Sequence, residues 1–247
     1  MKAERQERAA AVILAAGSGT RMGSDTKKQY MQIEGRPVIY YSLKAFEESP
    51  VQEIVLVVSP GDVTYCQKEI VEKFGFKKVR RIVEGGMERY HSVAIGLKQT
   101  ADCDYIFIHD GARPLVTNEI IERALFCVRK HKACVVGMPV KDTIKIADDE
   151  GNIVSTPNRN LTWLVQTPQT FAAPLIKKAY ESLIEREEEL KKSGLVITDD
   201  AMVVEAITGN KVKLIEGAYE NIKITTPEDL GTAENFLKLR AAGRIKG

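Results

Sequence analysis

A glycine-rich turn near the start of the chain carries the residue types that bind phosphate groups. The turn spans residues 17–23 (Gly-Ser-Gly-Thr-Arg-Met-Gly), and it follows an apolar run at 10–16. Glycine lets backbone N–H groups approach a ligand closely, and several such donors together form a concavity that binds anions. Arg21 and Lys28 add positive charge that a purely structural turn does not need. We therefore expect this turn to bind a polyphosphate.

Two common phosphate-binding motifs do not fit the turn. The dinucleotide motif needs a third glycine three residues after Gly19, where this chain has Met22. The P-loop motif needs Gly-Lys-Ser/Thr at that point, and no such triplet follows Gly17. The missing glycine argues against an NAD-dependent dehydrogenase, which is the alternative from another enzyme class. A non-catalytic nucleotide-binding module is a further alternative.

The elements that must position this turn alternate along the first half of the chain. Apolar runs predict strands, and amphipathic patterns between them predict helices. Such alternation implies right-handed crossovers and a Rossmann-like α/β fold, a mostly parallel sheet with helices on both faces. Ligands bind such sheets at the carboxyl ends of the strands. The strands are expected at 10–16, 54–58, 79–83, 105–108 and 133–136, and the helices at 37–48, 62–74, 88–100 and 117–131.

The pattern changes at residue 139. An alternating segment at 139–156 with a polar turn predicts a β-hairpin. A two-stranded ribbon is marginally stable in water, so we expect this arm to pack on a partner subunit. Beyond it we expect helices at 174–192 and from 198, a strand at 212–215 and a last helix after Thr226. Residues 1–247 are predicted to be one domain with 139–156 as its protruding arm.

Composition excludes several function classes. The 247 residues are 44% hydrophobic with a net charge of +2, which gives no support to nucleic-acid binding. Residues 1–8 are polar, and no apolar run approaches the length of a membrane span. Four cysteines without a C-x-x-C pair, and only three histidines, form no zinc pattern. We expect free thiols in a cytoplasmic protein.

Other polar residues follow the later strands. Gly85, Gly86 and Arg89 come after 79–83, and Asp110 and Arg113 come after 105–108. Taken alone, the first group could equally be a tight turn beside a solvated arginine. The second could equally be a salt bridge within a loop. Because all of them belong at the edge of the sheet where the glycine turn lies, a shared ligand site is favoured.

Eight short motifs follow one another along the chain. They are Ala15-Ala16-Gly17-Ser18-Gly19-Thr20-Arg21-Met22, Lys28-Gln29-Tyr30, Gly85-Gly86-x-x-Arg89, His109-Asp110-Gly111-Ala112-Arg113-Pro114, Lys141-Asp142-Thr143, Gln166-Thr167-Pro168-Gln169, Thr198-Asp199-Asp200-Ala201 and Asn221-Ile222-Lys223-Ile224-Thr225. Taken together, these motifs resemble the 2-C-methyl-D-erythritol 4-phosphate cytidylyltransferase family over residues 9–238. Ribitol-5-phosphate cytidylyltransferase shares most of them and is the alternative. Ala15-Ala16-Gly17 is more similar to the opening of the erythritol enzymes.

The resemblance implies a nucleotidyltransferase fold similar to that of glycosyltransferases of type A. It also implies transfer of CMP from CTP to a sugar-alcohol phosphate, with release of pyrophosphate. The implied catalytic residues are Arg21, Lys28, Arg159 and Lys223. Those implied to bind the nucleotide are Ala15, Ala16, Gly17, Ser18, Gly19, Gly85, Gly86, Arg89, Ser92 and Asp110. Those implied to bind the alcohol phosphate are Asp110, Arg113, Thr143, Arg159, Thr167, Thr198 and Lys223.

The resemblance further implies a cofactor and a partner. Mg²⁺ would be held mainly by the CTP phosphates, with Asp110 the nearest carboxylate and no metal-binding set of side chains. Thr143 and Arg159 flank the hairpin, which in this family reaches into the partner subunit, so the resemblance implies a homodimer that exchanges arms. Two positions depart from the family pattern. Lys27 stands where proline is frequent, and Asn158 stands where an acid is common.

Overall fold

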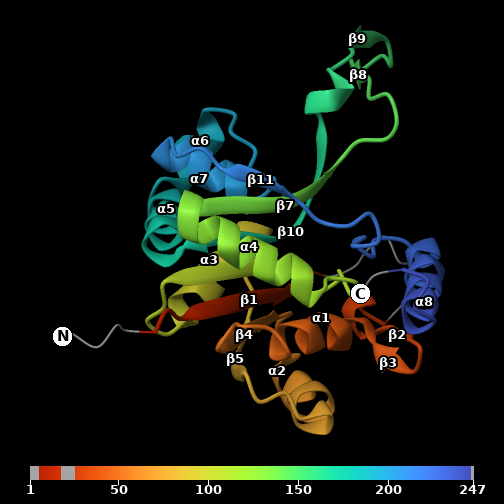
Figure 1. Ribbon diagram of the computed structural model, residues 1–247. Helices are drawn as coiled ribbons and strands as arrows, with labels where there is room; N and C mark the ends of the chain where they lie inside the picture. The colour runs from red at the N-terminus through yellow and green to blue at the C-terminus, as the bar shows by residue number, and fades with distance from the viewer. Residues whose placement is uncertain (1–5, 18–25, 246–247) are drawn as a thin grey trace.

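A seven-stranded sheet forms the centre of the molecule in the computed structural model, which describes residues 6–17 and 26–245 (Figure 1). The strand order is β11-β7-β10-β6-β1-β4-β5. All neighbouring strands run parallel except β10, which is antiparallel to both β6 and β7. The strands are β1 (Ala9–Ala15), β4 (Glu53–Val58), β5 (Val79–Glu84), β6 (Tyr105–Asp110), β7 (Ala133–Pro139), β10 (Trp163–Ala172) and β11 (Lys213–Glu216).

Helices cover both faces of the sheet because successive side chains of a buried strand point to opposite faces. In β1, Ala11 and Ile13 pack in one apolar layer with the first set of helices, whereas Ala10 and Val12 pack in the other with the second set. The first set is α1 (Val38–Glu47), the π-helix η3 (Cys66–Glu72) and α4 (Asn118–His131). The second is α3 (Arg89–Gln99), α5 (Ala173–Glu185) and α7 (Asp200–Thr208).

Smaller elements complete the fold. The last helix, α8 (Pro227–Ala241), packs beside the short β2–β3 hairpin through a third apolar cluster that includes Ile33, Ile224 and Ala233. Within the described part of the chain, every helix is too short or too polar to span a bilayer. The remaining elements are η2 (Lys28–Tyr30), β2 (Gln32–Ile33), β3 (Arg36–Pro37), α2 (Val63–Tyr65), β8 (Ile146–Ala147), β9 (Ile153–Ser155), η4 (Arg159–Leu161) and α6 (Glu187–Lys192).

One central strand has no counterpart among the predicted elements. The segment of β10 contains Gln166, Thr167 and Gln169, and Pro168 cannot donate a backbone hydrogen bond, so its sequence does not favour a central strand. The structure accommodates the proline with a cis Thr167–Pro168 bond and a shift of the ladder with β7 between Val165 and Gln169. The mixed sheet therefore has its antiparallel strand beside the predicted site.

The predicted hairpin is present but is shorter than its alternating pattern suggests. Only Ile146–Ala147 and Ile153–Ser155 pair as strands, and the connecting segments lie outside the sheet. Figure 1 shows this arm projecting away from the body of the molecule above β7. Most of the apolar side chains in its two strands are exposed, which agrees with the marginal stability of an isolated ribbon. The strongly exposed ones in and beside the arm are Ile146, Ile153, Val154, Leu161 and Leu164.

The helix ends differ in two places from the expected ranges. The helix predicted at 174–192 is interrupted at Arg186, whose backbone is not helical, and it therefore forms α5 and α6. The helix predicted at 62–74 begins as α2 and continues as η3. The predicted start of the last helix is confirmed, because Thr226 and Asp229 form a reciprocal capping box with Pro227 in the first turn.

Candidate active site

A cavity of about 360 Å³ lies at the carboxyl ends of β1, β5 and β6. Its wall contains the backbone that follows β1, the turn that carries Lys28, and the loop between β5 and α3. The lining residues include Ala15, Ala16, Gly17, Lys28, Gly86, Arg89, Ser92, Asp110 and Lys223, all of which the sequence motifs predicted. Ser18, Gly19 and Arg21 lie outside the described residues.

The loop after β5 fits against the end of β1 because Gly85 has no side chain. A Cβ atom on Gly85 would lie 2.5 Å from the Ala16 Cβ and 2.6 Å from the Ser92 Oγ, so only glycine fits there without displacement. The Gly86 amide donates to Ser92 Oγ at 3.1 Å. Ser92 itself is 4% exposed in the first turns of α3. Its hydroxyl thus shapes the cavity wall as well as lining it.

Three cations surround the carboxylate of Asp110, the last residue of β6. The Lys223 Nζ lies 2.9 Å from Oδ2, and the Nε atoms of Arg89 and Arg113 lie 3.6 and 3.7 Å from the carboxylate oxygens. Burial alone would raise the pKa of Asp110, but the charges of Arg89, Lys223 and Arg113 lower that pKa well below its usual range. Asp110 is therefore ionised at neutral pH and fixes the positions of all three cations.

A second contact holds Arg89. Its guanidinium donates two hydrogen bonds of 2.8 Å to the carboxylate of Asp200, which is fully buried in the first turn of α7. Bidentate pairing fixes the plane of a guanidinium as well as its position. Arg89 consequently links α3, α7 and Asp110 across the site. Its side chain is 31% exposed, which leaves part of it open toward the cavities.

A smaller cavity of about 290 Å³ adjoins the first, and both are lined by Arg89, Asp110 and Lys223. Its other walls come from Arg113, from β10 and from the segment before α7. The lining residues from the last two are Val165, Gln166, Thr167, Gln169, Thr198 and Asp199. The site is thus two adjoining hollows that share a buried carboxylate and two cations.

A buried histidine fixes the hydroxyl of Thr167. The Asp110 amide donates to Thr167 Oγ1 at 3.0 Å, and Thr167 Oγ1 lies 2.9 Å from the Nδ1 of His109. The Arg113 carbonyl can only accept, so the Nε2–H of the neutral ring donates to it at 3.3 Å, and Nδ1 accepts from the Thr167 hydroxyl. His109 is fully buried, and burial lowers its pKa to about 4. The neutral ring therefore orients both Thr167 and Arg113.

The buried histidine predicts a pH-dependent stability. An unfolded histidine has a pKa of about 6.5, so only the unfolded chain takes up this proton as the pH falls toward 4. The contribution of His109 to stability is complete above pH 6.5 and is lost as the pH falls through the folded pKa of about 4. Between pH 7 and pH 5 we expect it to lower the free energy of unfolding by about 2 kcal/mol.

Urea unfolding at a series of pH values measures this effect. The His109→Gln variant should lose that part of the slope between pH 7 and pH 5. The variant His131→Gln is the matched control, because His131 is exposed, and it should keep the wild-type slope. A wild-type slope in His109→Gln would contradict the prediction.

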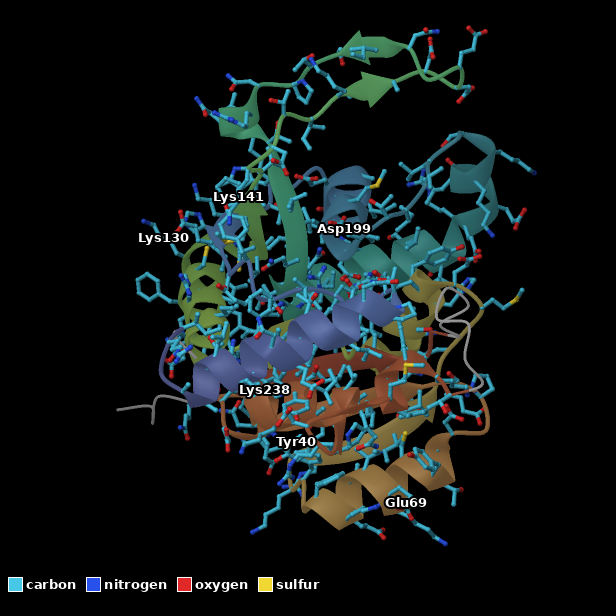
Figure 2. The ribbon with its side chains drawn as sticks, turned by 90° about the vertical axis from the view of Figure 1, so that its right-hand side faces the viewer. Tyr40, Glu69, Lys130, Lys141, Asp199 and Lys238 are labelled. Carbon is cyan, nitrogen blue, oxygen red and sulfur yellow. The ribbon has the colours of Figure 1, made fainter. Side chains whose placement is uncertain are left out.

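Two predicted site residues are not brought to these cavities. Thr143 is exposed in the arm, and Arg159 is exposed in η4, where its guanidinium lies 3.5 Å from the Lys141 carbonyl. Figure 2 shows Lys141 at the base of the arm. Neither residue lines the hollow around Asp110 within its own chain. Thr198 does line the smaller cavity, and its side chain is exposed.

Comparison with known proteins shows which family the chain belongs to. The model of the 2-C-methyl-D-erythritol 4-phosphate cytidylyltransferase family matches residues 9–239. The chain belongs to this family. The enzyme named 2-C-methyl-D-erythritol 4-phosphate cytidylyltransferase from Alkaliphilus oremlandii is 49% identical over 243 residues, which are 98% of this chain and 100% of the relative. That from Caldanaerobacter subterraneus subsp. tengcongensis is 50% identical over 230 residues, 92% and 98% of the two chains.

Solved structures agree with this membership. The crystal structure of 4-diphosphocytidyl-2C-methyl-D-erythritol synthase from Anaerococcus prevotii has a TM-score of 0.81 and 34% identity, covering 94% of this chain and 96% of that one. The Thermus thermophilus 2-C-methyl-D-erythritol 4-phosphate cytidylyltransferase has a TM-score of 0.71 and 30% identity, covering 94% and 99%. The predicted α/β fold and enzyme class are therefore confirmed. Neither the dehydrogenase nor the ribitol alternative is favoured.

Several residues of the cytidylyltransferase site have no role in the sequence-based prediction. Gln29 and Asn221 lie inside quoted motifs, yet their contacts depend on tertiary structure. Asn221 is fully buried. Its side-chain amide donates to the Thr167 carbonyl at 2.9 Å, and its backbone carbonyl accepts from the Arg113 guanidinium at 2.8 Å. Asn221 thereby joins the segment that carries Lys223 to β10. No spacing rule in the sequence indicates such a contact.

Proposed function

We propose that this chain transfers CMP from CTP to 2-C-methyl-D-erythritol 4-phosphate, giving 4-diphosphocytidyl-2-C-methyl-D-erythritol and pyrophosphate. Two adjoining cavities that share Arg89, Asp110 and Lys223 carry the proposal. A transfer between two anionic substrates needs two binding hollows that meet at fixed positive charge. The names of the relatives supply the identity of the second substrate.

The larger cavity suits the nucleotide. Its wall is glycine-rich backbone at Gly17 and Gly86 together with the side chain of Lys28. Backbone amides and a lysine form the donor set that binds phosphate groups. We assign to CTP the nucleotide-binding residues that the motifs indicate: Ala15, Ala16, Gly17, Ser18, Gly19, Gly85, Gly86, Arg89, Ser92 and Asp110.

The smaller cavity suits the sugar-alcohol phosphate. Lys223 at its border supplies positive charge for the phosphate, and Arg113 and Thr198 supply donors for hydroxyl groups. Thr167 lines it as well, although its hydroxyl is engaged by His109 and the Asp110 amide. Asp110 accepts hydrogen bonds from Lys223 at the point where the two cavities meet. Both substrates would therefore be held against the same carboxylate.

The chemistry requires positioning and charge stabilisation. The attacking group is a phosphate monoester, whose second pKa of about 6 leaves it anionic at neutral pH, so no general base is needed. One of its oxygens forms a bond to the α-phosphorus of CTP while the bond to the β-phosphate breaks and pyrophosphate leaves. Arg21 and Lys28 would stabilise the charge that develops on the α-phosphate and on the leaving group.

A magnesium ion fits a site of this kind when phosphate oxygens supply most of its ligands. Within residues 6–17 and 26–245, no three His, Cys, Asp or Glu side chains are grouped so that they could hold a metal ion. Asp110 is the carboxylate common to both cavities. Mg²⁺ commonly binds through one or two carboxylates plus substrate phosphates, and its charge would offset that of the triphosphate.

The arm at 139–156 is proposed to complete the site of a second subunit in a homodimer. Thr143 lies near the start of the arm and Arg159 follows its end, and both lie outside the two cavities of their own chain. The exposed apolar residues of the arm, including Ile153 and Val154, would be buried against the partner. The catalytic set would then be Arg21, Lys28 and Lys223 of one subunit together with Arg159 of the other.

Two broader predictions belong with this function. We regard residues 1–247 as one nucleotidyltransferase domain that carries the arm. We also expect a cytoplasmic location, which is supported by four buried cysteines that are all free thiols.

Pyrophosphate release measured with two substrates in parallel tests the proposed reaction. With CTP and Mg²⁺ we expect 2-C-methyl-D-erythritol 4-phosphate to give a kcat/KM at least about tenfold above that of ribitol 5-phosphate, because a misfitted polyol leaves polar groups unpaired. ATP in place of CTP is the control for nucleotide binding. A higher kcat/KM with ribitol 5-phosphate would establish the ribitol alternative instead.

A further inference from the structure

The turn that carries Lys28 is held from outside the cavity by an aspartate on a neighbouring loop. We propose that Asp62 is a positioning residue for Lys28, acting through Lys27 and Tyr30. This inference rests on the role assigned to Lys28 under the proposed function. Asp62 is the residue that precedes α2 and lies in the loop after β4.

The contacts of Asp62 reach both ends of the turn. Lys27 Nζ lies 2.8 Å from Oδ1 and 2.7 Å from Oδ2, and the Tyr30 hydroxyl donates to Oδ2 at 3.0 Å. Lys27 and Tyr30 lie on either side of Lys28 and Gln29, the two residues of this turn that line the cavity. One carboxylate therefore fixes the backbone on each side of Lys28.

The opposite side of the turn is tied to the cavity wall. The Gln29 side chain is 1% exposed and donates to the Ala15 carbonyl at 2.7 Å and to the Gly17 carbonyl at 3.3 Å. With Gln29 held at the end of β1, and with Lys27 and Tyr30 held by Asp62, the backbone of the turn is anchored on two sides. The Lys28 side chain is then directed by a constrained backbone.

Asp62 is itself positioned relative to the same cavity. Its amide donates to the Ser59 carbonyl at 3.0 Å, and the Ser59 hydroxyl donates to the Ala16 carbonyl at 3.2 Å. The next amide back, that of Gly61, donates to the Glu84 carboxylate at the end of β5 at 2.8 Å. The loop 59–62 thus connects the Lys28 turn to the ends of β1 and β5.

The pairing also separates the functions of two adjacent lysines. The charge of Lys27 is matched by Asp62, whose side chain is 18% exposed, and Lys27 does not line the cavity. Lys28 does. The Lys27–Asp62 pair therefore contributes geometry, while Lys28 contributes charge at the substrate.

The test compares Asp62→Asn in the wild type and in the Lys28→Ala variant. Asparagine keeps the size of the side chain but removes the charge that holds Lys27. We expect kcat to fall about tenfold in the wild-type background, because small displacements of a catalytic group are costly, while the KM for CTP changes less than about threefold. In the Lys28→Ala background we expect no further loss of kcat, because the group being positioned is gone.

Two milder variants and one control accompany this cycle. Tyr30→Phe and Lys27→Met each remove one arm of the contact, and each should lower kcat about threefold with little change in melting temperature. Lys73→Met removes the exposed Lys73–Glu69 pair on the neighbouring helical segment. That segment contacts Tyr30 through Tyr65 and Cys66, whereas the Lys73–Glu69 pair lies further along the chain. This control should keep wild-type kcat.

The outcomes separate the inference from the proposed function. An equal loss of kcat from Asp62→Asn in both backgrounds would assign Asp62 a general structural role and overturn the inference. So would unchanged kcat in Asp62→Asn when Lys28→Ala is severely impaired, and in that case the proposed function would stand. Full activity in Lys28→Ala would overturn the role assigned to Lys28 and this inference with it, while the transfer reaction itself would stand.

Discussion

The Lys28→Ala variant is expected to lower kcat by about a hundredfold or more, the scale of losing one preorganised electrostatic contact in a transition state. Lys28 lines the cavity assigned to CTP, and the reaction accumulates negative charge on the α-phosphate and the departing pyrophosphate. The adjacent Lys27 cannot substitute for it, because its ammonium group is bound to Asp62. Initial rates of pyrophosphate release at saturating CTP and alcohol phosphate measure the effect.

The matched control is Lys27→Ala. It removes the lysine one residue away, which does not itself line the cavity. Only the positioning of Lys28 is then disturbed, so kcat should stay within about tenfold of the wild type. Near-normal kcat in Lys28→Ala would refute the assignment of Lys28. An equally severe loss in Lys27→Ala would mean that the turn tolerates no change, and the two lysines could not be distinguished.

Restoration of activity in a mixed dimer is the second large effect. Arg159→Ala and Lys28→Ala should each be nearly inactive as homodimers. If Arg159 serves the site of the partner, a heterodimer of the two variants carries both lesions in one site and leaves the other site intact. A two-fold dimer has two sites, so the heterodimer should recover about half of the wild-type activity.

The heterodimer can be isolated by co-expression of the two variants with different affinity tags. If Arg159 acted within its own subunit, each site would keep one lesion and activity would stay at the level of the homodimers. The matched control pairs Lys223→Ala with Lys28→Ala, because both residues line one cavity of a single chain and no recovery is expected. A monomer in sedimentation equilibrium would contradict the arm exchange directly.

The parallel part of the sheet could be predicted because its strands are apolar and buried on both sides. β1 and β4 contain runs of Ala, Val, Ile and Leu, and β6 begins with the apolar run Tyr-Ile-Phe-Ile. The glycines and charges that follow these strands belong to one edge of the sheet. β10 could not be predicted in this way. It places Gln166, Thr167 and Gln169 in a central strand, where they line a polar cavity, and Pro168 lies among them.

The candidate site was predictable in its residue types and less so in its contacts. The motifs indicated Asp110, Arg89 and Lys223, but not that the buried carboxylate of the first would form ion pairs with the other two. The pairing of Lys27 with Asp62 spans 35 positions, and no local periodicity encodes it. Contacts of this kind depend on how loops from separate strands meet, which a single sequence does not reveal.

The place of β10 between β6 and β7 sets an order for assembly during synthesis. The contiguous strands β6, β1, β4 and β5 all lie within residues 9–110, so the emerging chain can build this block first. β7 cannot join it until the ribosome has made the arm and then residues 163–172, because β10 is the strand that bridges β6 and β7. Lys28 and the loop at Gly85 and Gly86 therefore belong to the part that a nascent chain completes early. Thr167 and Lys223, which border the second cavity, arrive last.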